Sequence, residues 1–518
     1  MKIRIKPFFL TVLVFSLILS GCSSNENKAV TSNEESKIND RTLEISVGPD
    51  MLTWDIHNHV TTATEAIHVN VFDYLLMRDE KGEIKPHLAK SWENINPTTW
   101  QFELNENVMF HNGDPLTSED VKFTLERVAK DTKLRSNSDY NTIKEIKVID
   151  DYTFQIISQE PDPMLLSRIS RQASGILPKK YIEENGWEHF KKHPIGSGPL
   201  QFVEWVRDDR IVLEPFEDYF NQKVTDWDKV VFRAIPEDST RVSELLTKNL
   251  DIAVNIPTSD WKRIQDADGV SVVDSPSNRT YMLFLRTQKG WPTADEKVRE
   301  AIDYAIDDGA IVKYLLEGYG TPSLTRVNPG DFGMKEDLYG KYNFDVEYSK
   351  KLLAEAGYSN GLSITLSGPN GRYIKDREIL QVISGMLDNV GIETDTNILT
   401  WNTFVEHREK QEFKEGYLIA LGSSFFDAGQ SLDYYSSSRS ESINGYNNEE
   451  VDQLLKEAET VLNEQVREQN YHRVQEIAKD ERPIIPIFQM NQFFGVNDQI
   501  NFEPRLDELI YVPDITHK

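Results

Sequence analysis

Hydrophobic and polar residues alternate at the start of the folded part of the chain. Leu43, Ile45 and Val47 are separated by polar residues, which is the pattern of a half-buried strand. The same alternation, interrupted by turn residues, predicts β-hairpins over 143–157 and 200–213. The first half of the chain is therefore expected to contain antiparallel strand pairs.

A helical period follows Thr117. Thr117 and Asp120 have the spacing of a capping box, in which each side chain bonds to the backbone of the other residue. Val121, Leu125 and Val128 then recur on one helical face. These features predict an amphipathic helix that begins at this threonine.

From about residue 230 onward, predicted strands and helices alternate. Strand–helix–strand units of these lengths favour parallel pairing and an α/β architecture. The predicted strands of this part are 230–235, 250–254, 281–286, 362–366, 392–399 and 417–421, with a further strand starting at 483. An earlier strand is predicted over 99–104. The predicted helices are 236–249, 296–307, 345–356, 376–390, 451–462 and 464–479.

The N-terminus has the pattern of an export signal. A basic segment is followed by an apolar stretch, Phe8–Leu19, that is too short for a comfortable membrane span. The run Leu19-Ser20-Gly21-Cys22 resembles the bacterial lipobox, which implies a lipoprotein signal peptide over 1–21 and lipidation of Cys22. The alternative is an ordinary secretory signal with an incidental cysteine. Residues 22–41 are polar and lack a hydrophobic period, so they are expected to form a flexible tether.

Composition and charge narrow the function. A chain of 518 residues is too long for one compact core, so two or three domains are expected. The formal net charge of −28 argues against nucleic acid as a partner, because phosphate binding favours a basic surface. Since Cys22 is the only cysteine, the chain has no internal disulfide and no cysteine metal cluster.

Enzyme motifs give little support for catalysis. The run Gly357–Gly361 matches G-x-S-x-G, but a hydrolase elbow needs the order strand, serine, helix, and here the predicted order is helix, turn, strand. The sequence contains no HExxH motif or other dense set of metal ligands. We therefore expect a protein that is not an enzyme and has no cofactor and no bound metal.

Several motifs resemble one family of binding proteins. Residues 104–123, LNENVMFHNGDPLTSEDVKF, are similar to the signature segment of the extracellular solute-binding proteins of family 5, which serve peptide- and nickel-type ABC importers. Residues 236–257 and 296–307 are also typical of this family. Gly196-Ser197-Gly198 resembles its crossing point between domains, where glycine permits backbone angles that other residues avoid.

The resemblance implies a fold and a division of the chain. The expected fold is α/β, of the periplasmic-binding-protein type II (Venus flytrap) class, with two α/β lobes and an additional α+β domain. The implied division assigns 42–75, 199–295 and 488–518 to lobe I, 76–198 to the extra domain, and 296–487 to lobe II. The signature segment then lies in the extra domain.

The resemblance also implies ligand-binding residues. Arg372, with Tyr373, occupies the place where dipeptide binders hold the peptide carboxylate, and Asp427 the place of the aspartate that holds the α-amino group. Because the common Asp-Pro-Asp of that loop is missing, Asp433 is a possible substitute for Asp427. The remaining candidates are backbone or hydroxyl donors at Gly422, Ser423 and Ser424, a stacking Trp401, and His59. The alternatives are a core tryptophan and solvated loops.

These features predict a lipid-anchored receptor at the outer face of the cell membrane. It would bind short peptides as a monomer and deliver them to the permease and ATPase subunits of an ABC importer. An alternative ligand is a nickel chelate or another small solute, such as a glutathione-like molecule, with His57, His59 and His407 as candidate contacts. Alternatives of other classes are a secreted hydrolase and a peptide-signal or chaperone-like role.

Overall fold

A computed structural model describes residues 41–79, 82–221 and 225–518 of the chain. The predicted signal peptide, the lipidation site Cys22 and nearly all of the predicted tether lie outside the described residues. Within those residues, no helix has both the length and the apolar composition required to cross a membrane.

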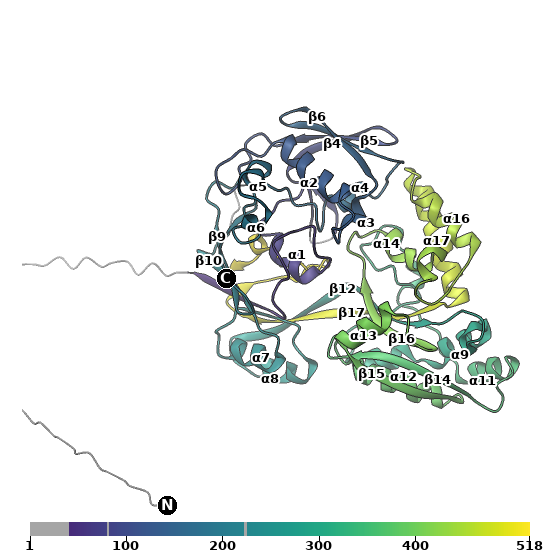
Figure 1. Ribbon diagram of the computed structural model, residues 1–518. Coiled ribbons are helices and arrows are strands. Elements are labelled where there is room, and N and C mark those ends of the chain that lie inside the picture. The colour runs from purple at the N-terminus through teal and green to yellow at the C-terminus, as the bar shows by residue number, and fades with distance from the viewer. Residues whose placement is uncertain (1–40, 80–81, 222–224) are drawn as a thin grey trace, which may run out of the picture. The chain divides into compact units, whose positions relative to one another are not determined.

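One large sheet runs through the described chain (Figure 1). Its strands follow the order β15-β14-β16-β12-β17-β11-β1-β10-β9-β8, and a short strand, β13, pairs with β17 at the side. In chain order the strands are β1 (Thr42–Val47), β8 (Leu200–Val206), β9 (Arg210–Pro215), β10 (Lys229–Ala234), β11 (Ile252–Val254), β12 (Val270–Leu285), β13 (Thr321–Pro322), β14 (Leu362–Asn370), β15 (Ile392–Thr400), β16 (Gly416–Gly422) and β17 (Ile484–Asn497).

Two long antiparallel strands join the two halves of this sheet. β12 and β17 pair from Phe284 and Ile484 at one end to Val270 and Asn497 at the other. At the first end β12 also pairs with β16, and at the other end β17 also pairs with β11. The β12–β17 register shifts between Pro276 and Thr280, so the ladder is locally interrupted in its middle. Such irregularities bend and twist a strand pair, which makes this stretch the natural hinge between the two halves.

The half that contains β14–β16 is buried on both faces. Leu283 of β12 and Leu418 of β16 join one hydrophobic cluster, whereas their neighbours Phe284 and Ile419 join another on the opposite face. This follows from the alternation of side chains along a strand. The helices covering the two faces are α9 (Glu296–Ala305), α11 (Val346–Glu355) and α12 (Asp376–Asp388) on one side, and α13 (Trp401–Glu409), α14 (Ala428–Leu432), α16 (Glu449–Ala458) and α17 (Glu464–Glu481) on the other.

The half that contains β1 departs from one detail of the predicted topology. The strands predicted over 230–235 and 250–254 are β10 and β11, and the helix between them is α7 (Asp238–Leu246). They do not pair with each other, because β1 lies between them and pairs in parallel with both. Parallel pairing is thus confirmed, but the partner strand comes from the start of the chain and not from the same unit.

A separate four-stranded antiparallel sheet has the order β4-β5-β7-β6. Its strands are β4 (Ala89–Asn96), β5 (Thr99–Leu104), β6 (Ile143–Asp150) and β7 (Thr153–Ser158), and α2 (Ser118–Lys130) packs on it. The predicted hairpin and capping box are confirmed: the Asp120 carboxylate accepts a 2.9 Å hydrogen bond from the Thr117 N–H. The predicted boundaries of the two lobes and the extra domain stay predictions.

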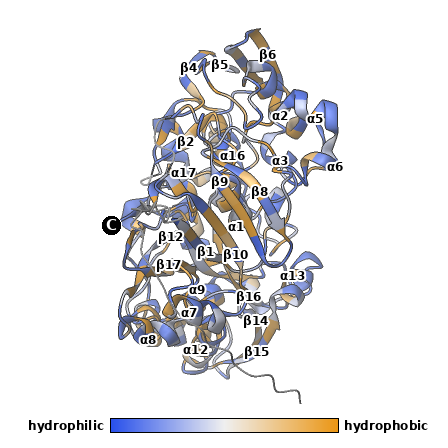
Figure 2. Cartoon of the chain, turned by 90° about the vertical axis from the view of Figure 1, so that its left-hand side faces the viewer, coloured by the Kyte–Doolittle hydropathy of each residue, from blue (hydrophilic) through white to orange (hydrophobic). Residues whose placement is uncertain are grey.

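Shorter elements complete the connections. The short strands are β2 (Leu76–Arg78), β3 (Ile84–Pro86), β18 (Ile500–Asn501) and β19 (Thr516–His517), and the short helices are α1 (Thr62–His68), α3 (Asn137–Tyr140), α4 (Leu165–Arg168), α5 (Lys179–Asn185), α6 (Trp187–Phe190), α8 (Trp261–Gln265), α10 (Asp308–Ala310) and α15 (Ser437–Ser440). Figure 2 shows α5 as largely hydrophilic, in keeping with Ile182 as its single buried residue. The run Gly357–Gly361 lies between α11 and β14, so the predicted helix–turn–strand context of this serine motif is confirmed.

The two glycines of the Gly-Ser-Gly crossing segment serve a different purpose from the one predicted. Neither Gly196 nor Gly198 has a positive φ angle. Instead, a Cβ atom at Gly196 would lie 1.8 Å from the carbonyl oxygen of Val71, and one at Gly198 would lie 2.6 Å from the carbonyl carbon of the same residue. Close approach of two backbone segments therefore explains these glycines, and unusual backbone angles do not.

Substitution at this crossing is predicted to destabilise the protein strongly. Gly196→Ala forces two backbone segments apart and should lower the free energy of unfolding by about 3 kcal/mol or more. Gly48→Ala is the matched control, because a Cβ there meets no atom within 4 Å and the residue has no positive φ angle. Urea denaturation of both variants measures the difference. Equal stability of the two would contradict the close-approach explanation.

Candidate functional site

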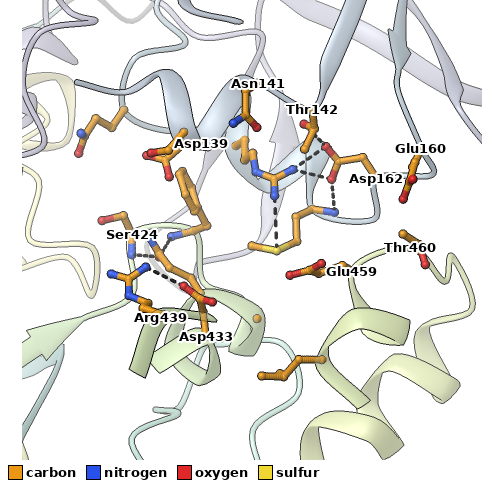
Figure 3. A pocket seen from close by; sticks show the side chains of 18 of the residues that line it. Asp139, Asn141, Thr142, Glu160, Asp162, Ser424, Asp433, Arg439, Glu459 and Thr460 are labelled. Atoms are coloured by element: carbon orange, nitrogen blue, oxygen red, sulfur yellow. Dashed lines mark hydrogen bonds and ion pairs between the residues drawn. The ribbon is translucent and has the colours of Figure 1, made fainter. Parts of the chain in front are cut away.

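A large cleft lies between the four-stranded unit and the helices that follow β16. Its volume is about 910 Å³, which is within the range of a site for a small organic ligand or peptide. One wall comes from residues 135–172, around α3 and α4, and the other from residues 422–471, around α14 and α16. Figure 3 shows side chains from these two walls pointing toward one another.

The first wall is stabilised by an internal ion pair. Asp162 accepts two 2.5 Å hydrogen bonds from Arg168 and one of 2.7 Å from the Thr142 hydroxyl. The Asp162 side chain also accepts from the backbone N–H of Met164, which fixes the turn that begins α4. Asp162 and Arg168 both line the cleft, and they neutralise each other in this ion pair (Figure 3).

The second wall is organised by a glutamine and by a second ion pair. The Gln430 side-chain oxygen accepts hydrogen bonds from the backbone N–H groups of Ser424 and Phe425, at 2.6 and 3.1 Å. Further along, Arg439 donates a 2.7 Å hydrogen bond to Asp433. The loop after β16 is therefore held open to the cleft in a defined conformation.

Three carboxylates of the cleft have no partner of this kind. Asp139, Glu160 and Glu459 line it, and none of them has an ion pair or a side-chain hydrogen bond within the described residues. Burial raises the pKa of Asp139, and Arg168 and Arg439 oppose that rise. Burial also raises the pKa of Glu459, and Asp433 adds to it. A cationic ligand group placed here would relieve both effects.

The structure brings some of the predicted site residues into the cleft. Gly422 and Ser424 line it, together with the possible substitute Asp433. Ser423 stands between the first two but is only 1% exposed, and its carbonyl oxygen accepts a hydrogen bond from the Asn278 amide. The signal for this loop was its position directly after a buried strand.

Asp427 lies apart from the cleft and is used within the fold. It is 2% exposed and accepts a 2.7 Å bond from the Arg467 guanidinium and a 3.0 Å bond from the Tyr471 hydroxyl. Its carboxylate also caps α14 by accepting from the N–H of Gly429. All of these partners belong to the protein, so the carboxylate holds the start of α14 onto α17.

Arg372, Tyr373 and Trp401 form a cluster of their own. The Arg372 guanidinium lies 5.1 Å from the Tyr373 ring and 5.3 Å from the Trp401 ring, within the range of cation–π contacts. Asp376 shapes this turn by accepting backbone N–H bonds from residues 371–373. None of the three lines the 910 Å³ cleft, so the structure separates this predicted subsite from Gly422 and Ser424.

The candidate histidines have protein partners. His59 is 1% exposed, with its Nε2 atom 3.1 Å from Nδ1 of His68. His57 lies fully buried beside Arg127, and burial lowers its pKa to about 3. His407 stands 3.8 Å from Glu412. Within the described residues no group of three or more metal-binding side chains is assembled.

A buried carboxylate lies near the second wall. Asp331 is 6% exposed, and one of its oxygens accepts a 3.3 Å bond from the Asn328 N–H while the other, Oδ1, has no partner. Burial raises the pKa of Asp331 to about 7, with Asp427 adding to the rise and Arg78 opposing it. This group therefore changes its charge near neutral pH.

Comparison with known proteins identifies the family. Residues 83–443 match the family described as "Bacterial extracellular solute-binding proteins, family 5 Middle". The chain belongs to this family. Family members are solute-binding proteins and not a class of enzymes. The resemblance inferred from residues 104–123 is thereby confirmed.

Individual family members are similar along nearly their whole length. The oligopeptide-binding protein AppA of Bacillus subtilis is 25% identical over 529 residues, which cover 96% of each chain. The substrate-binding protein CtaP of Listeria monocytogenes gives a TM-score of 0.83 at 22% identity, covering 92% of this chain and 99% of CtaP. DppA of Helicobacter pylori gives 0.77 at 23% identity, covering 92% and 99%. These likenesses confirm the periplasmic-binding-protein type II fold.

Removal of the Asp331 charge is predicted to change the pH dependence of stability. The pKa of this carboxyl is near 3.8 in the unfolded chain and about 7 in the folded one, so the free energy of unfolding falls as pH rises between these values. Asp331→Asn abolishes this loss and should stabilise the protein above pH 7 by about 4 kcal/mol. Urea denaturation at pH 5 and pH 8 measures the effect.

Asp268→Asn is the control for this measurement, because Asp268 is exposed. Its stability should follow that of the unmodified protein at both pH values. A constant difference between Asp331→Asn and the unmodified protein across this pH range would show that Asp331 does not titrate as described.

Proposed function

We propose that this protein is a lipid-anchored receptor that captures short peptides outside the cell and delivers them to an ABC importer. The observation that carries this proposal is the charge arrangement of the 910 Å³ cleft. Unpartnered carboxylates at Asp139 and Glu459 stand in the same cleft as the guanidinium group of Arg439. A free peptide is a zwitterion, so its amino group and its carboxylate need partners of both signs, shielded from water.

The relatives support a peptide as the ligand class. The AppA relative is an oligopeptide-binding protein, and its solved structure holds a nonapeptide. The DppA structure from Helicobacter pylori contains the peptide STSA. The identities are 25% or lower, so the length and sequence of the peptide do not transfer from these proteins to this chain.

The β12–β17 connection supports a receptor that closes around its ligand. A bulged two-strand linker allows one half of the sheet to turn against the other with few contacts broken. A ligand that contacts residues 135–172 and 422–471 at once binds the closed form more tightly than the open one. It therefore shifts the population toward the closed form, which is the state presented to the permease.

Peptide capture is tested by native mass spectrometry and thermal shift. The purified protein is expected to carry adducts in the mass range of short peptides. After their removal, a mixture of free-ended peptides should raise the melting temperature, because ligand at a hundred times its Kd stabilises the folded state by about 2.7 kcal/mol. The same peptides with acetylated and amidated ends are the control, and stabilisation by these alone would contradict the charge argument.

Membrane attachment is tested at Cys22. Cys22→Ala removes the thiol that the lipobox would present for lipidation, so the protein should move from the membrane fraction to the medium or the soluble fraction. Ser23→Ala, next to it in the sequence, is the control and should stay with the membrane. Retention of the cysteine variant in washed membranes would contradict lipid anchoring.

A further inference from the structure

Arg326 is a buried charge without a counter-charge. Its side chain is 2% exposed, and two of its guanidinium nitrogens, Nε and Nη1, are fully buried without a hydrogen-bond partner. Within the described residues it forms no ion pair and no hydrogen bond. A buried ion without a partner costs several kcal/mol, so an arginine at this position requires an explanation.

The guanidinium of Arg326 packs on Tyr434, which lines the cleft. Its Cζ atom lies 4.3 Å from the centre of the tyrosine ring, and the Cζ atom of Arg439 lies 4.1 Å from the same ring. Two cations therefore share one aromatic ring, and each repels the other. Because Tyr434 and Arg439 line the cleft, Arg326 contacts a residue of its wall without lining it itself.

A third arginine adds to the same cluster. Burial alone raises the pKa of the Tyr434 hydroxyl, but Arg326, Arg439 and Arg408 together bring that pKa below its usual value. The hydroxyl thus experiences a strongly positive surrounding. The Tyr434 hydroxyl is itself a hydrogen-bond donor and would strengthen the binding of an anion beside it.

The nearby carboxylates do not neutralise this cluster. Asp433 forms an ion pair with Arg439, and its other oxygen accepts a hydrogen bond from the Ser436 hydroxyl. Asp331 favours the charged form of Arg326, but its own pKa of about 7 leaves it only partly ionised at neutral pH. Asp139 stands on the opposite wall, where Arg439 favours its charged form (Figure 3). The carboxylate that bonds to this cluster, Asp433, is therefore paired with Arg439 and not with Arg326.

We propose that Arg326, Arg408, Arg439 and Tyr434 form an anion subsite that receives a carboxylate of the bound ligand. The proposal rests on the proposed function and adds a place and an orientation to it. A carboxylate at Tyr434 and Arg439 would supply the counter-charge that Arg326 lacks. Arg326 acts as a positioning residue when the anion contacts the ring and Arg439, and as a direct ligand when the anion reaches its guanidinium.

The subsite predicts opposite effects of Arg326→Met on stability and on affinity. Methionine preserves most of the volume and removes the unpaired charge, so the ligand-free protein should melt at a higher temperature than the unmodified protein. Affinity for free-ended peptides should fall by about 10- to 100-fold, as expected for the loss of a charged contact. Isothermal titration calorimetry and thermal unfolding measure the two effects. A variant that is destabilised, or that binds as before, overturns the proposal.

Ligand variants distinguish the source of the carboxylate. Peptides are compared with a free or an amidated C-terminus, and separately with glutamate or glutamine as a side chain. In one of these two comparisons only, the unmodified protein should bind the charged peptide more tightly than the uncharged one, which identifies the group that the subsite holds. Arg326→Met should bind the two peptides of that comparison equally. Arg439→Gln, at an exposed position, serves as a second variant with the same expectation. Arg263→Met, at an exposed site on α8, is the control and should preserve the discrimination.

Acetate and inorganic phosphate separate this proposal from the proposed function. Either anion should stabilise the unmodified protein and leave Arg326→Met unchanged. If no peptide binds while these anions still discriminate between the two proteins, the peptide function fails and the subsite stands. If peptides bind but every variant discriminates as the unmodified protein does, the subsite fails and the peptide function stands.

Discussion

The pairing of β12 with β17 is the interaction on which the rest of the structure depends. Every strand of the large sheet on one side attaches through β16 to β12, and those on the other side attach through β11 to β17. Removal of this single antiparallel ladder would leave two unconnected half-sheets. The same ladder is interrupted between Pro276 and Thr280, so continuity and bending are both properties of one strand pair.

Most of the buried charges discussed above are paired, but Arg326 is not. Asp427 and Arg467 satisfy each other and fix α14 on α17, and Glu65 and Arg171 form a second pair that is almost fully buried. Paired in this way, charges specify one geometry at modest net cost. Arg326 breaks the pattern, since it is equally buried but lacks a carboxylate. Under the proposal above, a ligand carboxylate would supply the counter-charge that the fold itself does not provide to Arg326.

The sequence predicted local structure well where one physical signal dominates. The capping box at Thr117, the hairpin around Asp150 and the helix that begins near Glu296 each follow from short-range spacing, and each is present. The position of β1 between β10 and β11 was not predictable in this way, because it depends on a strand nearly two hundred residues away. Sequence patterns carry the period of an element but not the identity of its neighbour.

The sequence likewise predicted only some residues of the candidate site. Gly422 and Ser424 were found because they follow a buried strand, and the family resemblance pointed to their loop. Asp139, Glu459 and Arg326 were missed, since each lies in a polar stretch where an aspartate, glutamate or arginine is ordinary. Arg326 is distinguished by burial, and all three are distinguished by the absence of an ion-pair partner within the described residues, which is a property of the assembled fold.

The place of β17 in the chain has a consequence for biogenesis. This strand comprises Ile484–Asn497, near the C-terminus, yet it lies in the middle of the sheet between β12 and β11. A nascent chain that has not yet released these residues from the ribosome lacks the strand that joins its two half-sheets. Long-range pairing of this kind is slow to form. The topology thus delays completion of the large sheet until synthesis of the chain is nearly finished.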